Sequence, residues 1–366
     1  MVPSLVVAVL PEYGRAEASI GSRYRDSMTT VRIIGGGIAG ATLAATLERP
    51  DWAVTVHERR AQTPALDTAF ALFPQALRAL QPSGLRPAVE AAGVRIDAAQ
   101  ILTAEGRPLL RPPRLGALMI GRARLHSLLS AARPASTVLD LGEVDAPEDL
   151  DADVLVGADG AQSMVRRTTW GARSAPRRPP LTVIRGVVDA DLSNGSVTEY
   201  WGERMLFGIT PLPGGRTNWF TAFPERRFAS VADGLDHLRT AARVLPDPVT
   251  DVVDAATVEQ SVISGIHLSR PLPSFVRGRT VLIGDSAHAM QPNLGRGACE
   301  SIIDAAALAE LLNAHPPERA LSLYRRRRLL TPQLVREAAG VLSHVALAGG
   351  HAARLRNRVL TTIARS

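Results

Sequence analysis

Glycines at G-x-G-x-x-G spacing follow the first clear strand of the chain. In "VRIIGGGIAG" they are Gly35, Gly37 and Gly40. The first allows a tight turn, the second leaves room for a pyrophosphate to approach the backbone, and the third lets helix and strand pack closely. Free N–H groups at the start of the following helix suit an anion. The spacing therefore predicts a dinucleotide site, with a glycine-rich turn of another α/β fold as the alternative.

A carboxylate ends the next expected strand. The segment "AVTVHE" finishes at Glu58, 18 positions after Gly40. At this place in a βαβ unit, a carboxylate can bind both hydroxyls of a ribose. Glu58 is therefore the expected contact at the adenosine end of the ligand.

Two later segments repeat the arrangement of an apolar strand followed by an acid. "DVLVGADGAQSMVRR" leads from a strand to Asp159-Gly160, and "VLIGDSAHAMQPNLGRGACE" leads from a strand to Asp285. The second then forms a loop with Pro292, Gly295 and Gly297, followed by a long helix of small and apolar residues. Together the three motifs suit one extended ligand.

The three segments in this order resemble the class A flavoprotein monooxygenases of the para-hydroxybenzoate hydroxylase type. "PNLGRGACESIIDA" is similar to the salicylate hydroxylase and zeaxanthin epoxidase-like branch. The resemblance implies an α/β fold: a discontinuous Rossmann-like FAD-binding domain (28–175 and 265–345), an inserted antiparallel substrate sheet (176–264) and a C-terminal helix (346–366). "DTAFALFPQALRALQPSGL" (67–85) departs from the family pattern, because Thr68 and Ala69 replace glycines and Gln75 replaces asparagine.

The resemblance also assigns roles at a noncovalent FAD site. Asp285 would bind the ribitol chain, the loop 292–297 would pass beside the flavin ring, and the helix from Gly297 would direct its positive end at the ring. In "LMIGRARLHSLL", Arg122 fits an arginine near the ADP portion, with Arg124 as the alternative. Arg296 is expected to point to solvent, and Cys299 to be a packing residue. The full set of expected cofactor-binding residues is Gly35, Gly37, Gly40, Glu58, Arg122, Asp159, Gly160, Asp285, Pro292, Gly295 and Gly297.

The segment 176–264 alternates like an antiparallel sheet with a Pro-Gly-Gly hairpin. In "LTVIRGVV", strand alternation puts Leu181, Val183, Arg185 and Val187 on one face. An arginine among apolar neighbours suits a pocket for a phenolate or carboxylate, because an unpaired buried charge is costly. The expected substrate contacts are Arg185, Tyr200, Phe207 and Trp219, although a sheet core is the alternative for these aromatics. The catalytic candidates are Arg185, His288 and Pro292.

The activity implied by the resemblance is that of a single-component FAD monooxygenase. NAD(P)H would reduce the flavin, and dioxygen would form a flavin C(4a)-hydroperoxide that hydroxylates or epoxidises a small electron-rich substrate, aromatic or polyketide-like. A flavin oxidase or reductase and a non-catalytic FAD-binding protein stay open. A flavin halogenase is disfavoured, because that class relies on a lysine and the chain has none.

Length and composition exclude several classes of protein and of site. The 366 residues carry a net charge of +7, and all 42 basic residues are arginine, which a GC-rich genome would explain. Nucleic-acid motifs are absent, so "YRRRRLL" at 324–330 is interpreted as a solvated helix face. No apolar run spans a membrane, one cysteine excludes an internal disulfide, and no metal site is expected. Residues 1–27 are expected to be a disordered leader or to precede the true start. We expect a cytoplasmic protein that is a monomer or a homodimer.

Overall fold

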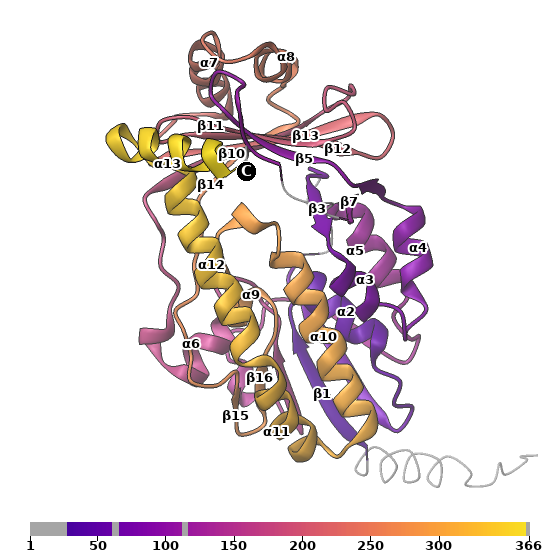
Figure 1. Cartoon of the computed structure of the whole chain (residues 1–366). Coiled ribbons are helices and arrows are strands. Elements are labelled where there is room, and N and C mark those ends of the chain that lie inside the picture. The colour runs from indigo at the N-terminus through magenta and orange to yellow at the C-terminus, as the bar shows by residue number, and fades with distance from the viewer. Residues whose placement is uncertain (1–27, 61–65, 112–115, 364–366) are drawn as a thin grey trace, which may run out of the picture.

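The computed structural model describes residues 28–60, 66–111 and 116–363. Within these ranges, two main sheets are stacked along the long axis of the molecule, with the helix-covered parallel sheet at one end and the antiparallel sheet at the other (Figure 1). The proposed leader, 1–27, lies outside the described residues. No described helix is long and apolar enough to cross a membrane.

The first sheet carries the dinucleotide motif. Its strand order is β15-β16-β9-β1-β2-β8, and all neighbouring strands are parallel except the edge pair β15 and β16. The strands are β1 (Thr29–Ile34), β2 (Trp52–Glu58), β8 (Val138–Leu141), β9 (Val154–Gly157), β15 (Val276–Arg277) and β16 (Thr280–Leu282). Both predicted strands around the glycine motif are confirmed, and β2 ends at Glu58 as expected. The three motif segments thus start from adjacent strands of one sheet.

Helices cover this sheet and a small neighbouring sheet. The helix after the glycines is α2 (Ile38–Thr46), and the Asp-Gly motif leads into α6 (Met164–Trp170). The small sheet has the order β3-β7-β4, formed by β3 (Ala69–Leu72), β7 (Ala117–Gly121) and β4 (Val94–Ile96). Its helices are α3 (Pro74–Ala79), α4 (Leu85–Ala91) and α5 (Arg122–Ala131), so the predicted step from strand to helix at Arg122 is confirmed.

The second main sheet has seven strands in the order β14-β10-β13-β12-β11-β5-β6. Five come from the predicted insertion: β10 (Leu181–Val188), β11 (Val197–Trp201), β12 (Leu206–Leu212), β13 (Arg216–Pro224) and β14 (Ser261–Ser264). The other two, β5 (Ala99–Thr103) and β6 (Pro108–Leu110), come from the segment that the sequence assigned to the FAD-binding domain. The predicted insertion at 176–264 therefore leaves out two strands of this sheet, because β5 pairs in parallel with β11 and extends it.

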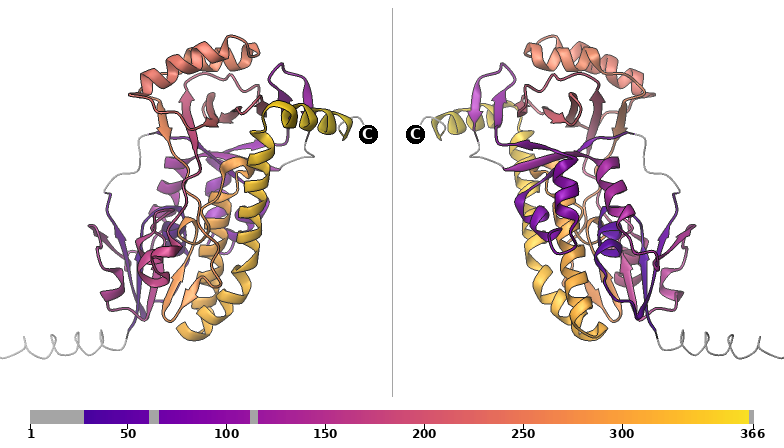
Figure 2. Two further views of the ribbon diagram at one scale, coloured as in Figure 1. Left: turned by 90° about the vertical axis from the view of Figure 1, so that its left-hand side faces the viewer. Right: turned by 90° about the vertical axis from the view of Figure 1, so that its right-hand side faces the viewer.

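The two faces of the seven-stranded sheet have different neighbours. Helices α7 (Val231–Ala242) and α8 (Asp247–Ala255) lie on the outer face, away from the parallel sheet (Figure 2). Their apolar residues form a core with alternate residues of the strands, among them Ile184 and Ile209. The inner face, which carries Arg185, looks toward the parallel sheet and is left to line the space between them.

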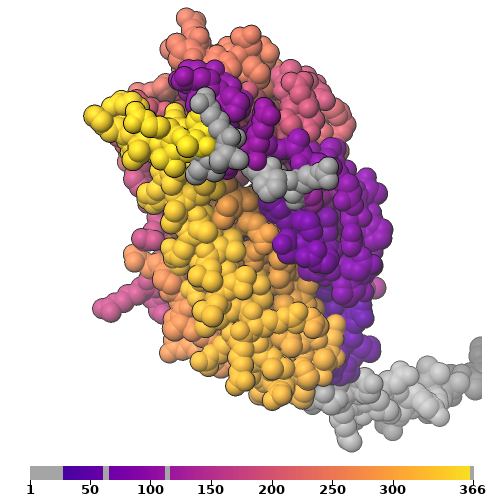
Figure 3. Space-filling model, in the orientation of Figure 1, coloured from indigo at the N-terminus to yellow at the C-terminus, as the bar shows by residue number. Residues whose placement is uncertain are grey.

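The C-terminal helices connect the two halves. Helices α10 (Gly297–Ala314) and α11 (Pro317–Arg328) pack on the parallel sheet, and α12 (Leu330–Ala346) runs up to the seven-stranded sheet. Helix α13 (Gly350–Ile363) then crosses beside β6, and Figure 3 shows α12 and α13 over the left of the face in view. The predicted C-terminal helix at 346–366 is thus the separate helix α13, and α12 itself reaches Ala346.

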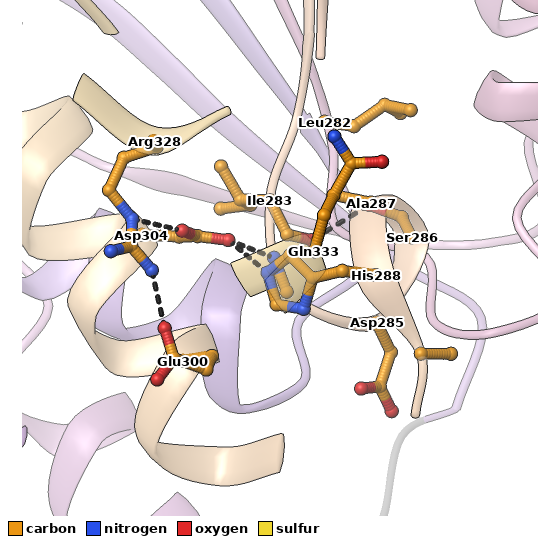
Figure 4. A network of polar contacts seen from close by, with 12 residues as sticks. Leu282, Ile283, Asp285, Ser286, Ala287, His288, Glu300, Asp304, Arg328 and Gln333 are labelled. Atoms are coloured by element: carbon orange, nitrogen blue, oxygen red, sulfur yellow. Dashed lines mark hydrogen bonds and ion pairs between the residues drawn. The ribbon is translucent and has the colours of Figure 1, made fainter. Parts of the chain in front are cut away.

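A buried ionic cluster joins α10 and α11 to the short helix α9 (Asp285–His288). The Asp304 carboxylate accepts hydrogen bonds from His288 Nε2 at 2.6 Å, from Arg328 Nε at 2.6 Å and from the Gly284 N–H at 2.9 Å (Figure 4). Arg328 also donates to Glu300 at 2.7 Å. The interpretation of 324–330 as a solvated face was therefore wrong for Tyr324 and Arg328, which are buried, although the arginines between them are exposed.

We expect Arg328→Met to lower the free energy of unfolding by about 3–5 kcal/mol, because it removes the buried cation that Asp304 and Glu300 share. Arg326→Met is the matched control, since Arg326 lies on the same helix and is exposed. Urea unfolding of both variants measures the difference. Equal stability of the two variants would contradict a structural role for the cluster.

Candidate active site

A large cavity lies between the parallel sheet and the inner face of the seven-stranded sheet. Its volume is about 1550 Å³. Sites for one small ligand are usually about 300–1000 Å³, so this cavity has room for a cofactor and a second molecule. The motif residues form one part of its wall and the strands β10, β11 and β13 form another.

The glycine motif forms the cavity wall at the start of α2. Gly36 and Gly37 line the cavity, and a Cβ atom at Gly37 would meet nothing within 4 Å. Gly35 and Gly40 act through the backbone instead. Gly35 has a φ of +101°, and a Cβ at Gly40 would lie 1.9 Å from the Gly35 carbonyl oxygen. No side chain in the described residues caps α2, so its first N–H groups are available to an anion at the cavity wall.

Glu58 and Arg122 lie where the sequence placed them, on the cavity wall. Glu58 accepts hydrogen bonds from the N–H groups of Gly36 and Arg60, at 2.8 and 2.9 Å, so it also braces the glycine loop. The guanidinium of Arg122 stacks on the Phe70 ring, with 4.7 Å from Cζ to the ring centroid. Burial lowers the pKa of Arg122, and the nearby Asp285 carboxylate partly offsets this effect.

Asp285 is the carboxylate of the third motif. It lines the cavity and points away from the Asp304 cluster (Figure 4). Its side chain has no hydrogen-bond partner among the described residues. Pro292, Gly295 and Gly297 follow along the same wall, where α10 begins without a side-chain cap in the described part of the chain. A free carboxylate and a free helix N-terminus therefore face the same space.

The Asp-Gly motif lies next to the cavity wall but outside the described lining. Asp159 is not among the described residues that line the cavity, whereas Ala158 and Ala161 are. Its Oδ2 atom accepts hydrogen bonds from the N–H groups of Met164 and Val165, at the start of α6. Gly160, with a φ of +80°, is also outside the described lining. The structure thus gives Asp159 a positioning role at the start of α6, and the predicted contact of Asp159 and Gly160 with the cofactor stays a prediction.

Arg166 is a positioning residue that the sequence did not assign. Its guanidinium is buried and donates to the carbonyl oxygens of Ser174, Ser286 and Ala287 at 2.8–3.0 Å, and also to that of Arg270. Burial lowers its pKa to about 10, with a further contribution from Arg336. Arg166 thus holds α9 against α6.

His288 does not reach the cavity. Its side chain is fully buried, and Nε2 is engaged by Asp304. The described cavity lining does not include it. His288 is therefore corrected from a catalytic candidate to a member of the buried cluster, because α9 directs it toward α10 while Asp285 points the other way.

Arg296 and Cys299 flank the start of α10. Arg296 was expected in solvent, but its Nη2 lies 2.7 Å from Glu300 and its guanidinium lies over the Phe73 ring. The Cys299 thiol is buried and donates to the Ala71 carbonyl oxygen at 3.2 Å. Burial raises the pKa of this thiol to about 11, which makes it a poor nucleophile at neutral pH. The geometry fits a packing residue and gives no support to covalent attachment.

Arg185 lines the cavity from β10, on the face predicted by strand alternation. Its Nε atom is buried without a hydrogen-bond partner among the described residues. Burial lowers the pKa of the guanidinium to about 10, and the positive charge of Arg122 adds to this shift. The Arg185 guanidinium forms no ion pair with a carboxylate of the described chain. It is therefore suited to bind an anionic or hydrogen-bond-accepting group of a ligand.

Three of the predicted substrate contacts lie on the wrong face of the sheet. Tyr200, Phe207 and Trp219 are buried in the core against α7 and α8, and Phe207 stacks on Trp219. Their neighbours in sequence, Trp201 and Phe220, line the cavity instead. The sequence shows the alternation of side chains along each strand. Which of the two sets faces the cavity depends on strand register, here the pairing of Arg185 with Phe220.

The sequence also missed polar and apolar parts of the wall. Glu199 and Asn218 line the cavity from β11 and β13. Asn218 accepts a hydrogen bond from the Ala69 N–H at 2.9 Å, which ties the seven-stranded sheet to the segment 67–85. Helix α12 adds apolar side chains, including Leu334 and Leu342. The sequence did not predict that α12 lines the cavity, because the periodicity of a helix does not show which part of the protein its apolar face will contact.

The described residues fit FAD. Uncapped N-termini of α2 and α10, the unpaired Asp285 carboxylate and the buried, unpaired Oε1 atom of Gln291 all border one cavity. These groups can bind a pyrophosphate, hydroxyls and a polar ring edge, which are the parts that FAD combines.

We expect Asp285→Ala to lose most of the affinity for FAD. A carboxylate that accepts hydrogen bonds from ligand hydroxyls contributes about 1.5–3 kcal/mol, so affinity should fall about tenfold or more. Asp97→Ala is the matched control, since Asp97 is exposed and outside the cavity lining. The measurement is the ratio of flavin to protein after purification, followed by titration of the flavin-free protein with FAD. Full flavin content in the Asp285 variant would contradict the assignment.

Comparison with known proteins agrees with this geometry. The family model described as "FAD binding domain" matches residues 113–339. The aurachin C monooxygenase/isomerase of Stigmatella aurantiaca is 31% identical over 316 residues, covering 78% of this chain and 80% of that protein. The 3-amino-4-hydroxybenzoate 2-monooxygenase of Streptomyces cremeus is 32% identical over 332 residues, covering 82% and 83%.

The solved structures show the same fold. Klebsiella pneumoniae HpxO complexed with FAD and uric acid superposes with a TM-score of 0.79 at 20% identity, covering 92% of this chain and 93% of that one. The predicted Rossmann-like domain with an inserted antiparallel sheet is thereby confirmed. With the family model matching more than half of the chain and two relatives above 30% identity, the chain belongs to the FAD-dependent monooxygenases of the para-hydroxybenzoate hydroxylase type.

Proposed function

We propose that this FAD-dependent monooxygenase uses NAD(P)H and dioxygen to hydroxylate a small electron-rich aromatic compound with an anionic or hydrogen-bond-accepting group. The single observation behind this proposal is the shared cavity, in which the motif residues face the unpaired Arg185 from the other sheet. FAD supplies the oxygen-transfer chemistry when bound, and the protein supplies placement, charge and exclusion of water.

Arg185 has the clearest substrate role. A buried guanidinium without a partner binds a carboxylate, phenolate or carbonyl oxygen more strongly than an exposed one, because neither group is fully hydrated in the cavity. The register places the Phe220 ring beside it, so an aromatic substrate can stack on Phe220 while Arg185 fixes its orientation.

The start of α10 has a second role in the proposal. Its N-terminus, together with Gly295 and Gly297, borders the cavity without a capping side chain in the described chain. A helix N-terminus favours negative charge close to it. The Pro292–Leu294 turn lies on the same wall and leaves no bulky side chain at Gly295 or Gly297. This end of the cavity thus suits the electron-rich edge of a reduced cofactor.

The wall toward α12 is apolar. Val183 and Trp201 from the sheet line the cavity together with Val335 and Leu342 of α12, and Leu334, which is 67% exposed, also lines it. An apolar wall of this kind accommodates hydrocarbon on the substrate, since burial of apolar surface is favourable. A cytoplasmic location and a monomeric or homodimeric state are part of the proposal.

A substrate screen tests the function. The purified yellow protein should oxidise NADPH or NADH slowly alone and faster with a substrate, and mass spectrometry should find a product heavier by one oxygen atom. The panel should combine aminohydroxybenzoates, other phenols, indoles, quinolones and aromatic polyketides. Stimulated coenzyme oxidation with only hydrogen peroxide as product, for every compound, would favour the oxidase alternative.

We expect Arg185→Leu to keep its FAD and its fold but to raise KM about tenfold or more, or to divert oxidation to peroxide, because the charged hydrogen bond to the substrate is lost. Arg239→Leu is the control, since Arg239 lies on α7, outside the cavity lining. The measurement is KM together with the ratio of product to NAD(P)H consumed. Unchanged values would remove Arg185 from the substrate site.

A further inference from the structure

One row of residues crosses the inner face of the seven-stranded sheet beneath the cavity. Arg185 on β10 is opposite Phe220 on β13, and Phe220 is opposite Gly208 on β12. Gly208 is in turn opposite Glu199 on β11. Directly opposed residues point to the same face of a sheet, and the three side chains of this row all line the cavity.

The middle of the row is an aromatic surface. A Cβ atom at Gly208 would lie 2.2 Å from Cζ of Phe220, so the ring leans over the glycine toward β11. Any larger residue at 208 would displace it. The Phe220 ring therefore covers the two central strands, with Arg185 on one side and Glu199 on the other.

Glu199 is held in place at the end of this row. Its Oε2 atom accepts a hydrogen bond from the Trp201 indole N–H at 2.8 Å. The Trp201 ring is covered by the Arg356 guanidinium, 5.6 Å from its centroid, and Arg356 also donates to the Trp201 carbonyl oxygen at 3.2 Å. Arg356 of α13 thus holds the Trp201 indole, and the indole in turn orients the Glu199 carboxyl group.

The second oxygen of Glu199 has no hydrogen-bond partner among the described residues, and no cation of the described chain forms an ion pair with this carboxyl. Burial raises the pKa of Glu199, and the Trp201 hydrogen bond only partly offsets this effect. A half-satisfied carboxyl group on a cavity wall is costly unless a ligand completes its hydrogen bonding.

The spacing of the row limits the ligand. Three interstrand steps of about 4.8 Å place the backbones of Arg185 and Glu199 about 14 Å apart. Side chains stand roughly perpendicular to a sheet, so a flat ligand of one aromatic ring or two fused rings fits between the ends of these two side chains, above Phe220.

We propose that Glu199 is a specificity-determining residue that accepts a hydrogen bond from an N–H or O–H group of the substrate, on the side of the aromatic ring opposite the acceptor bound by Arg185. This inference rests on the proposed function for the identity of the cavity as the substrate site. The enzyme then selects rings that carry an acceptor at one end and a donor at the other, stacked on Phe220.

Two pairs of probe compounds test the donor requirement. The first pair is 4(1H)-quinolone and its N-methyl derivative, and the second is 4-hydroxybenzoate and 4-methoxybenzoate. Within each pair the acceptor and the ring are kept and the donor is removed. Isothermal titration calorimetry with the FAD-loaded enzyme should give at least about tenfold tighter binding of the donor-bearing member in one or both pairs.

Variants connect this preference to Glu199. Glu199→Leu should bind both members of the pair within about twofold of each other, because the acceptor is gone. Glu199→Gln should keep part of the preference through its amide oxygen. Arg185→Leu should weaken both members equally. Glu259→Gln, an exposed site outside the cavity lining, should bind like the wild type.

A purely structural role for Glu199, as the partner of Trp201, predicts lower stability without a change in this preference. The proposal is overturned if the FAD-loaded wild type binds both members of each pair alike or binds none of the four probes. It is also overturned if Glu199→Leu keeps the preference of the wild type.

The substrate screen separates this outcome from failure of the proposed function. An oxygenated product from a panel compound, with the preference unchanged in Glu199→Leu, rejects the inference and keeps the monooxygenase activity. A preference lost in Glu199→Leu, with no oxygenated product from any compound, supports the substrate contact and rejects the proposed reaction.

Discussion

The buried carboxylate of Asp304 is the interaction on which the cofactor side of the cavity depends. It accepts hydrogen bonds from Gly284, His288 and Arg328, which come from the strand end, from α9 and from α11. Burial alone would raise the pKa of Asp304, but His288 and Arg328 reverse this effect and the pKa is lowered. Because these donors fix the turn after β16, Asp285 is directed into the cavity while His288 is directed away from it.

The cavity itself results from how two sheets with separate cores are joined. The seven-stranded sheet buries one face against α7 and α8, which leaves the other face for ligands. The hydrogen bond from Ala69 to Asn218 and the ion pair between Asp67 and Arg216 hold the two halves on one side. Helices α12 and α13 connect them on another, where Arg356 clamps Trp201. The cavity wall is therefore shared by segments far apart in sequence.

Local motifs were predictable from the sequence, whereas register and long-range pairing were not. The turn at Gly35, the strand ending at Glu58 and the helix after Gly297 follow from local sterics and spacing, and the structure has all three. The face of Trp219 depends on which residue pairs with Arg185, and the membership of β5 in the seven-stranded sheet depends on a parallel pairing across about a hundred residues. The burial of Arg328 was hidden because its partners lie on another helix, so its charged neighbours suggested a solvated face.

A crystal structure of the FAD-loaded protein tests the central claim, that one cavity brings the cofactor and the Arg185–Phe220–Glu199 row together. The account predicts the pyrophosphate at the N-terminus of α2 and Asp285 within hydrogen-bond distance of the ribitol chain. It also predicts the flavin ring between the loop 292–297 and the row, with space for an aromatic ring over Phe220. A flavin ring bound outside this space, or an Asp285 carboxylate without contact to the cofactor, would contradict it.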